Sequence, residues 1–236
     1  MTKSTSLSII VAIITISCCV PLARADNNAA VFNEDWKLKI RANAEKGDPQ
    51  AQDNLGILYC GGTGIPQDYT KAMQWFHKAA AQGNDDAQLN IGDLYYKGHG
   101  VPQNYTEAIK WYRKSADQGN ANLQLFLGDL YYRGEIVPKN YAEALKWYIK
   151  AANLGNATLE DRPLYELGVM YRDGEGVGQD YIQAYMWLNL AVAHNKLPKY
   201  MNDAETRDRL EKKMTPDQIS KAQRLSREWK PTKNTP

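Results

Sequence analysis

One motif recurs along this chain at a constant interval, and that repeat limits the possible folds more than any other feature. The motif Leu/Ile-Gly-x-x-Tyr has its glycine at Gly56, Gly92 and Gly128, which are 36 residues apart, and a fourth copy has Gly168, 40 residues further on. A second motif, Ala-x-x-Trp, keeps the same step, with its tryptophan at Trp75, Trp111, Trp147 and Trp187. Self-similarity at this period indicates stacked supersecondary units rather than one globular core.

Each unit is predicted to contain two antiparallel helices. In the second copy Ala87, Ile91 and Leu94 follow helical spacing, which predicts a first helix over about 86–97. Trp111 and its neighbours predict a second helix after the connection at 98–104. A glycine inside a helix costs about 1 kcal/mol relative to alanine. The recurrence of Gly92 therefore predicts that the second helix approaches too closely for a Cβ.

Capping signals mark several helix ends. Asn104 is a predicted N-cap, and Glu107 three residues later completes a capping box. The segment Thr215–Gln218 has an N-cap residue, a proline and a glutamine, which predict the start of a final helix. A lone helix is predicted over 34–45. A solenoid needs its apolar ends covered, so we assign capping roles to this helix and to 199–230.

These observations predict an all-α fold: an α/α superhelix (solenoid) of about four helix-turn-helix repeats with N- and C-terminal capping helices. The predicted parts are a signal peptide over 1–25, an N-terminal capping helix within 26–50, repeats over 51–193 (51–86, 87–122, 123–162 and 163–193), and C-terminal capping helices with a tail over 194–236.

The first 25 residues have the pattern of a secretory signal. Lys3 precedes an apolar run from Leu7 to Val20, and Ala23-Arg24-Ala25 is a small-x-small cleavage site. The run is shorter than the roughly 20 residues of a membrane span. We expect an exported protein, periplasmic or secreted, with no stable membrane span after cleavage. An uncleaved anchor and a lipoprotein modified at Cys18 or Cys19 are the alternatives.

Charge and cysteine content exclude some classes of function. Removing residues 1–25 takes away Lys3 and Arg24 from the 29 basic residues and none of the 27 acidic ones, which leaves a neutral balance. This gives no support for nucleic-acid binding. Only Cys60 then remains, so stability must come from packing rather than from an intrachain disulfide. Cys60 is interpreted as a small helix residue, with an interchain disulfide as the alternative.

The pattern A-x-x-x-L-G-x-x-Y-x-x-G-x-G-V-x-x-D/N-Y-x-x-A-x-x-W-Y-x-K-A-A-x-x-G resembles the Sel-one-like repeat (SLR) family, a relative of the tetratricopeptide repeats, over about residues 40–193. The resemblance implies an α/α superhelix that serves as a protein-interaction scaffold. Family members act in envelope biogenesis, polysaccharide export, signalling and host contact. An adaptor in envelope or polysaccharide export machinery is therefore one alternative function, and tryptophans exposed in a groove would favour it.

No catalytic constellation is found in the sequence. His77, His99 and His194 occupy unrelated repeat positions, and no His-x-x-x-His or Cys-x-x-Cys pair occurs, so neither a metal nor a cofactor is expected. Some cysteine-rich family members bind or hydrolyse β-lactams, but this chain lacks their cysteine pairs and any Ser-x-x-Lys. We predict that the protein is not an enzyme and keep the β-lactam activity as an unfavoured alternative.

A partner-binding groove is predicted on the first helices, by analogy with tetratricopeptide arrays. Positions that project together from these helices, away from the apolar face, are Asp93, Tyr96, Lys97, Asp129, Tyr132, Arg133, Tyr165 and Arg172. Tyrosine and arginine are common binding anchors. The expected partner is a protein or peptide with aromatic or aliphatic anchors and acidic groups. The alternative is that Tyr96 and Tyr132 pack between repeats.

Overall fold

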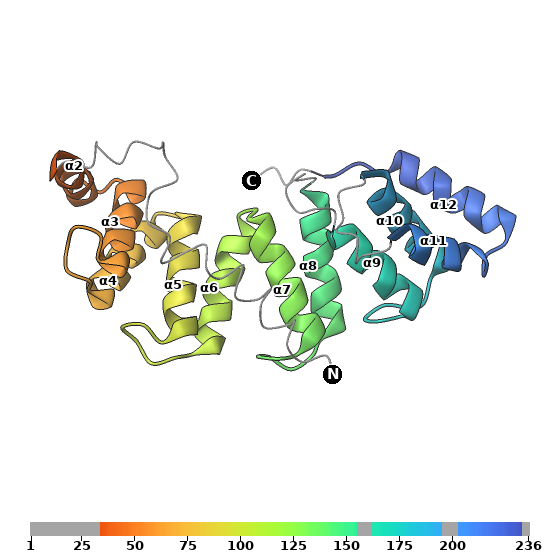
Figure 1. The fold of residues 1–236 in the computed structure, drawn as a ribbon, viewed down its shortest axis with the longest axis horizontal. Helices are drawn as coiled ribbons and strands as arrows, with labels where there is room; N and C mark the ends of the chain where they lie inside the picture. The colour runs from red at the N-terminus through yellow and green to blue at the C-terminus, as the bar shows by residue number, and fades with distance from the viewer. Residues whose placement is uncertain (1–33, 155–161, 195–202, 233–236) are drawn as a thin grey trace. The chain divides into compact units, whose positions relative to one another are not determined.

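The computed structural model describes residues 34–154, 162–194 and 203–232, and each regular element in these ranges is an α-helix (Figure 1). In chain order these are α2 (Glu34–Glu45), α3 (Pro49–Gly61), α4 (Tyr69–Ala81), α5 (Asp85–Lys97), α6 (Tyr105–Asp117), α7 (Ala121–Arg133), α8 (Tyr141–Asn153), α9 (Arg162–Asp173), α10 (Tyr181–His194), α11 (Asp203–Glu211) and α12 (Pro216–Glu228). The predicted signal peptide over 1–25 lies outside the described residues. Among the helices named above, none is long and apolar enough to cross a bilayer.

The chain divides into two compact units, Met1–Gln118 and Gly119–Pro236. In the first unit α3 pairs with α4 and α5 pairs with α6, while α4 also packs against α5 and α2 against α3. In the second unit α7 pairs with α8 and α9 with α10, while α8 contacts α9 and both α11 and α12 contact α10. Each unit thus holds two helical hairpins and its own end helix or helices.

The close approach predicted at the repeated glycines is confirmed. An ideal Cβ on Gly92 would lie 2.5 Å from Cε1 of Tyr112, and the same relation holds for Gly56 with Phe76 (2.4 Å), Gly128 with Tyr148 (2.5 Å) and Gly168 with Leu188 (2.6 Å). Carbon atoms in contact are normally about 3.5–4.0 Å apart. Each glycine therefore makes room for the side chain that the second helix of its own repeat inserts.

Asn104 caps the N-terminus of α6, but it does not form the predicted capping box with Glu107. Asn104 Oδ1 accepts a hydrogen bond from the Glu107 N–H at 3.1 Å, which confirms the N-cap of α6. The predicted reciprocal bond is wrong, because the Asn104 N–H donates to the Tyr95 carbonyl at 2.9 Å. The Glu107 carboxylate accepts from Lys110 Nζ at 2.6 Å. The Asn104 N–H, which a capping box would need as a donor to Glu107, is therefore already bonded to the end of α5.

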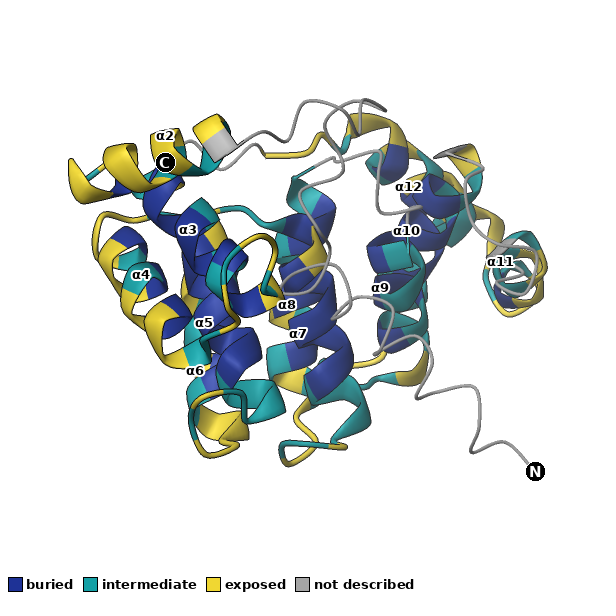
Figure 2. Ribbon diagram, turned by 60° about the vertical axis from the view of Figure 1, so that its left-hand side comes forward, coloured by how far each residue is buried: buried dark blue, intermediate teal, exposed yellow. Residues whose placement is uncertain are grey.

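The first helix of a hairpin buries polar side chains in addition to its apolar face. In α5 the buried residues include Gln88, Asn90 and Asp93 as well as the apolar positions that the sequence predicts. Figure 2 shows α5 largely buried, whereas α4 keeps an exposed outer side. Besides packing against α6 and α4, α5 also reaches the first helix of the preceding repeat, where Asn90 Nδ2 donates to Asp53 Oδ1 of α3.

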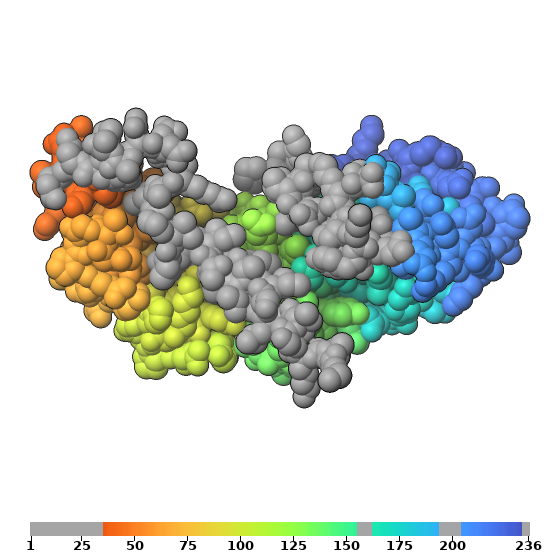
Figure 3. All heavy atoms as spheres, in the orientation of Figure 1, coloured from red at the N-terminus to blue at the C-terminus, as the bar shows by residue number. Residues whose placement is uncertain are grey.

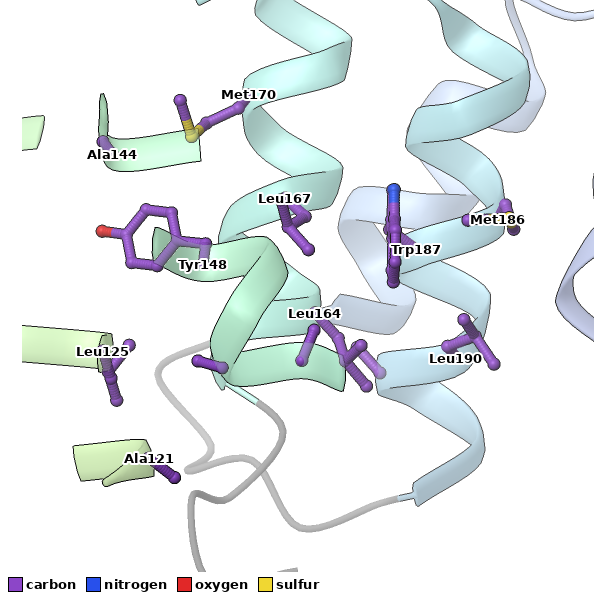
Figure 4. Close-up of a cluster of buried hydrophobic side chains, with 13 residues drawn as sticks. Ala121, Leu125, Ala144, Tyr148, Leu164, Leu167, Met170, Met186, Trp187 and Leu190 are labelled. Atoms are coloured by element: carbon purple, nitrogen blue, oxygen red, sulfur yellow. The ribbon is translucent and has the colours of Figure 1, made fainter. Parts of the chain in front are cut away.

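The core of the second unit is built in the same way. Leu164 and Leu167 of α9 lie between Tyr148 of α8 and Trp187 of α10 (Figure 4). Leu167 is 0% exposed, and Trp187 is 7% exposed. Each large aromatic side chain buries about 150–250 Å². The tryptophan of the last repeat therefore contributes to packing inside this unit.

Helices cover the outer hairpins. The helix predicted over 34–45 is present as α2, where Ala44 is 1% exposed and packs in a cluster with Leu55 and Leu58 of α3. The predicted C-terminal segment contains α11 and α12. Thr215 and Gln218 form a capping box at the start of α12, which confirms that helix start. The assignment of domain boundaries stays a prediction.

Candidate functional site

Asp93, one of the predicted groove residues, is an internal residue of the first unit. It is 1% exposed, and its Oδ1 accepts a hydrogen bond from the Tyr112 hydroxyl at 2.7 Å. Lys97 Nζ lies 3.9 Å from its other oxygen. Asp93 therefore does not lie on an exposed face as the helical spacing predicted. It joins α5 to α6 through the same tyrosine that packs on Gly92.

Tyr96, at the end of α5, is half-buried against the start of α6. Its ring centroid lies 5.2 Å from that of Tyr105 in an edge-to-face arrangement, and Tyr105 is 39% exposed. Tyr132 and Tyr141 repeat this pair in the second unit, with ring centroids 5.3 Å apart. Such pairs contribute about 0.5–1.5 kcal/mol beyond the area that they bury. Both predicted tyrosines thus pack within one repeat and keep part of their surface accessible.

A buried charge network joins α7 to α9 in the second unit. Asp129 is 7% exposed, and its Oδ1 accepts from the Tyr148 hydroxyl at 2.8 Å and from Arg162 Nη2 at 2.9 Å. Arg162 Nε also lies 3.5 Å from Glu166 Oε1. The arginine therefore sits between two carboxylates from successive repeats. Asp129, like Asp93, is an internal residue rather than an exposed one.

Burial shifts the titration of this network. Burial raises the pKa of Glu166, and the nearby Arg162 opposes the rise only in part. The pKa of Tyr148 is raised well above its usual value, first by burial and then by the charge of Asp129. The charged form of Glu166 thus depends on the arginine beside it, because a carboxylate away from water is costly without a partner.

The remaining predicted residues of the second unit lie on the same two helices, α7 and α9. We define the α7/α9 surface as Tyr132, Arg133, Tyr165 and Arg172, all of them partly exposed. Tyr132 and Tyr165 both pack against the hydrophobic cluster of this unit. The pKa of Arg172 is raised first by its hydrogen bonds to Asp173 and less by the charges of Asp173, Tyr165 and Tyr132. Arg172 is held in place by Asp173, which accepts from its Nε at 2.7 Å and from its Nη2 at 2.6 Å. Partly exposed aromatic and guanidinium side chains therefore occur on both α7 and α9.

Sequence reasoning missed Arg162 and Glu166, although they hold the network together. Arg162 lies in the segment where the repeat period lengthens, so no repeat position marks it. Asp53 and Asn90 form a comparable buried pair in the first unit, where Asn90 Nδ2 donates to Asp53 Oδ1 at 2.9 Å. Burial raises the pKa of Asp53 to about 7. These pairs join helices from different repeats, a relation that spacing within one repeat does not reveal.

The tryptophans of the second helices do not form an open aromatic surface. Trp147 is 2% exposed. The half-buried rings of Trp75 and Trp111 are covered by Lys78 and Lys114, whose ammonium groups lie 3.8 Å from the ring centroids. These contacts do not favour the carbohydrate-associated adaptor, which requires tryptophans exposed in a groove.

Two further features of the described residues concern metal ligands and the cysteine. No group of three or more His, Cys, Asp and Glu side chains there is placed to hold a metal ion. Cys60 is 0% exposed and packs among Ala72, Phe76 and their neighbours. This position fits the interpretation of Cys60 as a small packing residue of α3.

Comparison with known proteins agrees with this architecture. The family model described as Sel1 repeat matches residues 49–84, 85–120, 121–156 and 164–196. The chain is similar to the crystal structure of a Sel1 repeat protein from Oxalobacter formigenes, with 33% identity, a TM-score of 0.55, and coverage of 68% of this chain and 70% of that one. It is also similar to a protective antigen with an SLR fold from uropathogenic Escherichia coli, with 30% identity, a TM-score of 0.40, and coverage of 80% of this chain and 47% of that one. A comparison with curated protein sequences gives no match.

Proposed function

The chain belongs to the Sel1 repeat family, and from this premise we propose that it is an exported, non-catalytic scaffold that binds a protein or peptide partner. Repeats of this family form all-α solenoids and generally mediate protein–protein interaction. The finer proposal concerns where binding takes place. We assign it to the first helices of the repeats, and in the second unit to the α7/α9 surface.

The observation that supports the proposal is that Tyr132 and Tyr165 pack against the same cluster of the second unit and, like Arg172, remain partly exposed. Tyrosine and arginine are enriched among the residues that dominate binding energy at protein interfaces. Tyr132 packs on Tyr141, and Arg172 is fixed by two hydrogen bonds from its guanidinium to Asp173. Side chains that are ordered before binding lose less entropy on association. The surface is thus suited to binding a partner rather than to catalysing a reaction.

The first unit supplies a smaller counterpart. Tyr96 and Lys97 are partly exposed at the end of α5, whereas Asp93 is used internally. We therefore include Tyr96 and Lys97 as secondary contacts of the first unit and exclude Asp93 and Asp129 from direct contact with a partner.

Crosslinking in intact cells, read by mass spectrometry, tests the assignment. We expect Tyr132→Ala and Arg172→Ala to lose specific crosslinked partners, while the control Lys146→Ala, at a 58% exposed side chain on α8, keeps them. Thermal melting of each purified variant separates binding from packing. Equal crosslinking by all three variants, with unchanged melting, would overturn the assignment of the α7/α9 surface.

Export is the part of the proposal that rests on residues 1–25 alone, which the structure does not describe. The short basic start, the apolar run and the small-x-small site support it. Cell fractionation with N-terminal sequencing tests it directly. We expect a mature chain that begins at Asp26 outside the cytoplasm, and a full-length chain in the cytoplasmic fraction would contradict export.

A further inference from the structure

A small polar pocket lies in the second unit, at the C-terminal end of α9 and beside α11. Its volume is about 240 Å³, and its lining residues are Arg172, Asp173, Thr206, Arg209, Leu210 and Lys213. Figure 3 shows that atoms of α9, in teal, lie next to those of the C-terminal helices, in blue. The family model ends at residue 196, so one wall of the pocket comes from outside the matched repeats.

The charges around this pocket are mainly positive. Three of its lining residues are cations, and Asp173 is the one carboxylate among them. Asp173 binds Arg172, and Arg209 pairs with Glu205. Lys213 makes no ion pair within the described ranges, although its charge, after the hydrogen bonds from Arg172, helps to lower the pKa of Asp173. The pocket therefore offers the exposed ammonium group of Lys213, which forms no direct ion pair with a carboxylate of the described residues.

The size of the pocket limits what it can hold. Sites for drug-sized ligands and cofactors typically have volumes of about 300–1,000 Å³. A cavity of about 240 Å³ is suited to one or two amino-acid side chains or to a small anion. Guanidinium, ammonium and hydroxyl groups all donate hydrogen bonds to oxyanions, and the charged donors form the stronger ones.

We propose that this pocket binds the carboxylate of an acidic side chain on a peptide partner. The inference deepens the proposed function and rests on it. Arg172 connects the two sites, because it lines the pocket and also interacts with Tyr132 and Tyr165. The peptide that fits has a glutamate or aspartate in the pocket, beside an aromatic or aliphatic residue on the α7/α9 surface.

A carboxylate suits this pocket better than a phosphate dianion. Asp173 is the last residue of α9, so the pocket includes the end of a helix where the peptide dipoles place partial negative charge. Its own carboxylate adds a full negative charge to the lining. Both features oppose a dianion more strongly than a monoanion, whereas the cationic lining still favours a single negative charge.

Fluorescence anisotropy with the purified chain tests the pocket. The probe is a short fluorescein-labelled peptide in which Glu alternates with Tyr, and its control has Gln in place of Glu. We expect the Glu peptide to bind and the Gln peptide to bind at least about tenfold more weakly, since hydrogen bonds to charged groups contribute about 1.5–3 kcal/mol. Lys213→Ala should weaken binding of the Glu peptide about tenfold, because it removes the ammonium group that would bind the carboxylate.

The matched control is Lys212→Ala, which removes an exposed lysine that does not line the pocket. Equal affinity of the Glu peptide for the Lys213→Ala and Lys212→Ala variants would overturn the proposal. Tighter binding of inorganic phosphate than of the Glu peptide would also overturn it in favour of a phosphate site. If Lys213→Ala has no effect while Tyr132→Ala loses its cellular crosslinks, the pocket fails and the proposed function stands. If Lys213→Ala loses the Glu peptide while Tyr132→Ala keeps all its crosslinks, the pocket is supported and the α7/α9 assignment fails.

Discussion

The ring of Tyr112 occupies the space that a β-carbon on Gly92 would need, with Cε1 of the ring 2.5 Å from the ideal Cβ position. The hydroxyl of the same tyrosine donates to Asp93, the residue that follows the glycine. One side chain of α6 therefore fixes both the distance between the helices and the position of a buried carboxylate. In the second unit Tyr148 does the same: its ring packs on Gly128, and its hydroxyl donates to Asp129.

Gly92→Ala is expected to destabilise the chain, although alanine favours helix by about 1 kcal/mol relative to glycine. The added methyl group must displace the buried ring of Tyr112, and overpacking of this kind typically costs about 1–3 kcal/mol. Chemical denaturation should show a net loss of stability. Gly178→Ala is the control, because nothing lies within 4 Å of a Cβ at that position. A Gly92→Ala variant more stable than the parent chain would show that the ring moves aside freely.

Asp53→Asn is expected to change how stability depends on pH. Burial raises the pKa of Asp53 to about 7 from a normal 3.8, so the folded state holds this proton more tightly than the unfolded state. The contribution of Asp53 is fully favourable below about pH 4 and is lost as the pH rises through about 7. Asparagine can still accept the hydrogen bond from Asn90 without carrying a charge.

Denaturation of the parent and Asp53→Asn chains across this pH range provides the measurement. The advantage of the variant should grow between pH 4 and 8, by up to about 4 kcal/mol. Asp35→Asn removes a carboxylate whose side chain is 66% exposed and serves as the control. A stability difference between Asp53→Asn and the parent that is constant with pH would contradict the assignment.

Arg162→Ala is expected to be among the most destabilising single changes in the second unit. It leaves Asp129 and Glu166 buried without their cation, and breaking a buried pair in this way costs about 3–5 kcal/mol. The cost should shrink on acidification, because burial raises the pKa of Glu166 and protonation removes the negative charge of this carboxyl. Arg224→Ala, in an exposed pair with Glu228, should cost at most about 1 kcal/mol. Similar unfolding midpoints for the two variants would argue against a structural role of the network.

Thr215→Ala is expected to loosen the start of α12 locally. Thr215 Oγ1 accepts from the Gln218 N–H at 3.3 Å, and the Thr215 N–H donates to Gln218 Oε1 at 2.9 Å. Loss of an N-cap side chain typically costs about 1 kcal/mol. Hydrogen exchange should accelerate in the first turn of α12 and not in α9. Thr215→Ser retains the hydroxyl and should exchange like the parent chain.

The local rules of the repeat were predictable from the sequence because they depend on neighbours in the chain. Helical spacing identified the hairpins, and the recurrence of Gly92 indicated a close approach that Tyr112 fulfils. The N-cap at Asn104 was also predictable, since a cap needs only an oxygen and an N–H three residues later. The family was recognisable for the same reason, because its motif is a local pattern.

The sequence patterns gave a wrong prediction where one backbone N–H had two possible hydrogen-bond acceptors. The N–H of Asn104 bonds to the Tyr95 carbonyl rather than to Glu107, and only the folded connection determines that choice. Part of the predicted surface was misplaced for a similar reason. Asp93 and Asp129 project toward tyrosines of the second helix, whereas Tyr132, Tyr165 and Arg172 are partly exposed, and their role in binding stays a prediction.

By itself, the sequence determined the helices, their pairing into hairpins and the repeat family, since these follow from periodicity and from caps within a few residues. Only the tertiary structure decided which polar side chains are buried and which remain accessible. Arg162 reaches Asp129 across 33 residues, and Asp53 is bonded by Asn90 across 37. Contacts of this kind depend on how one hairpin packs against the next, and the spacing of residues within a single repeat does not predict that packing.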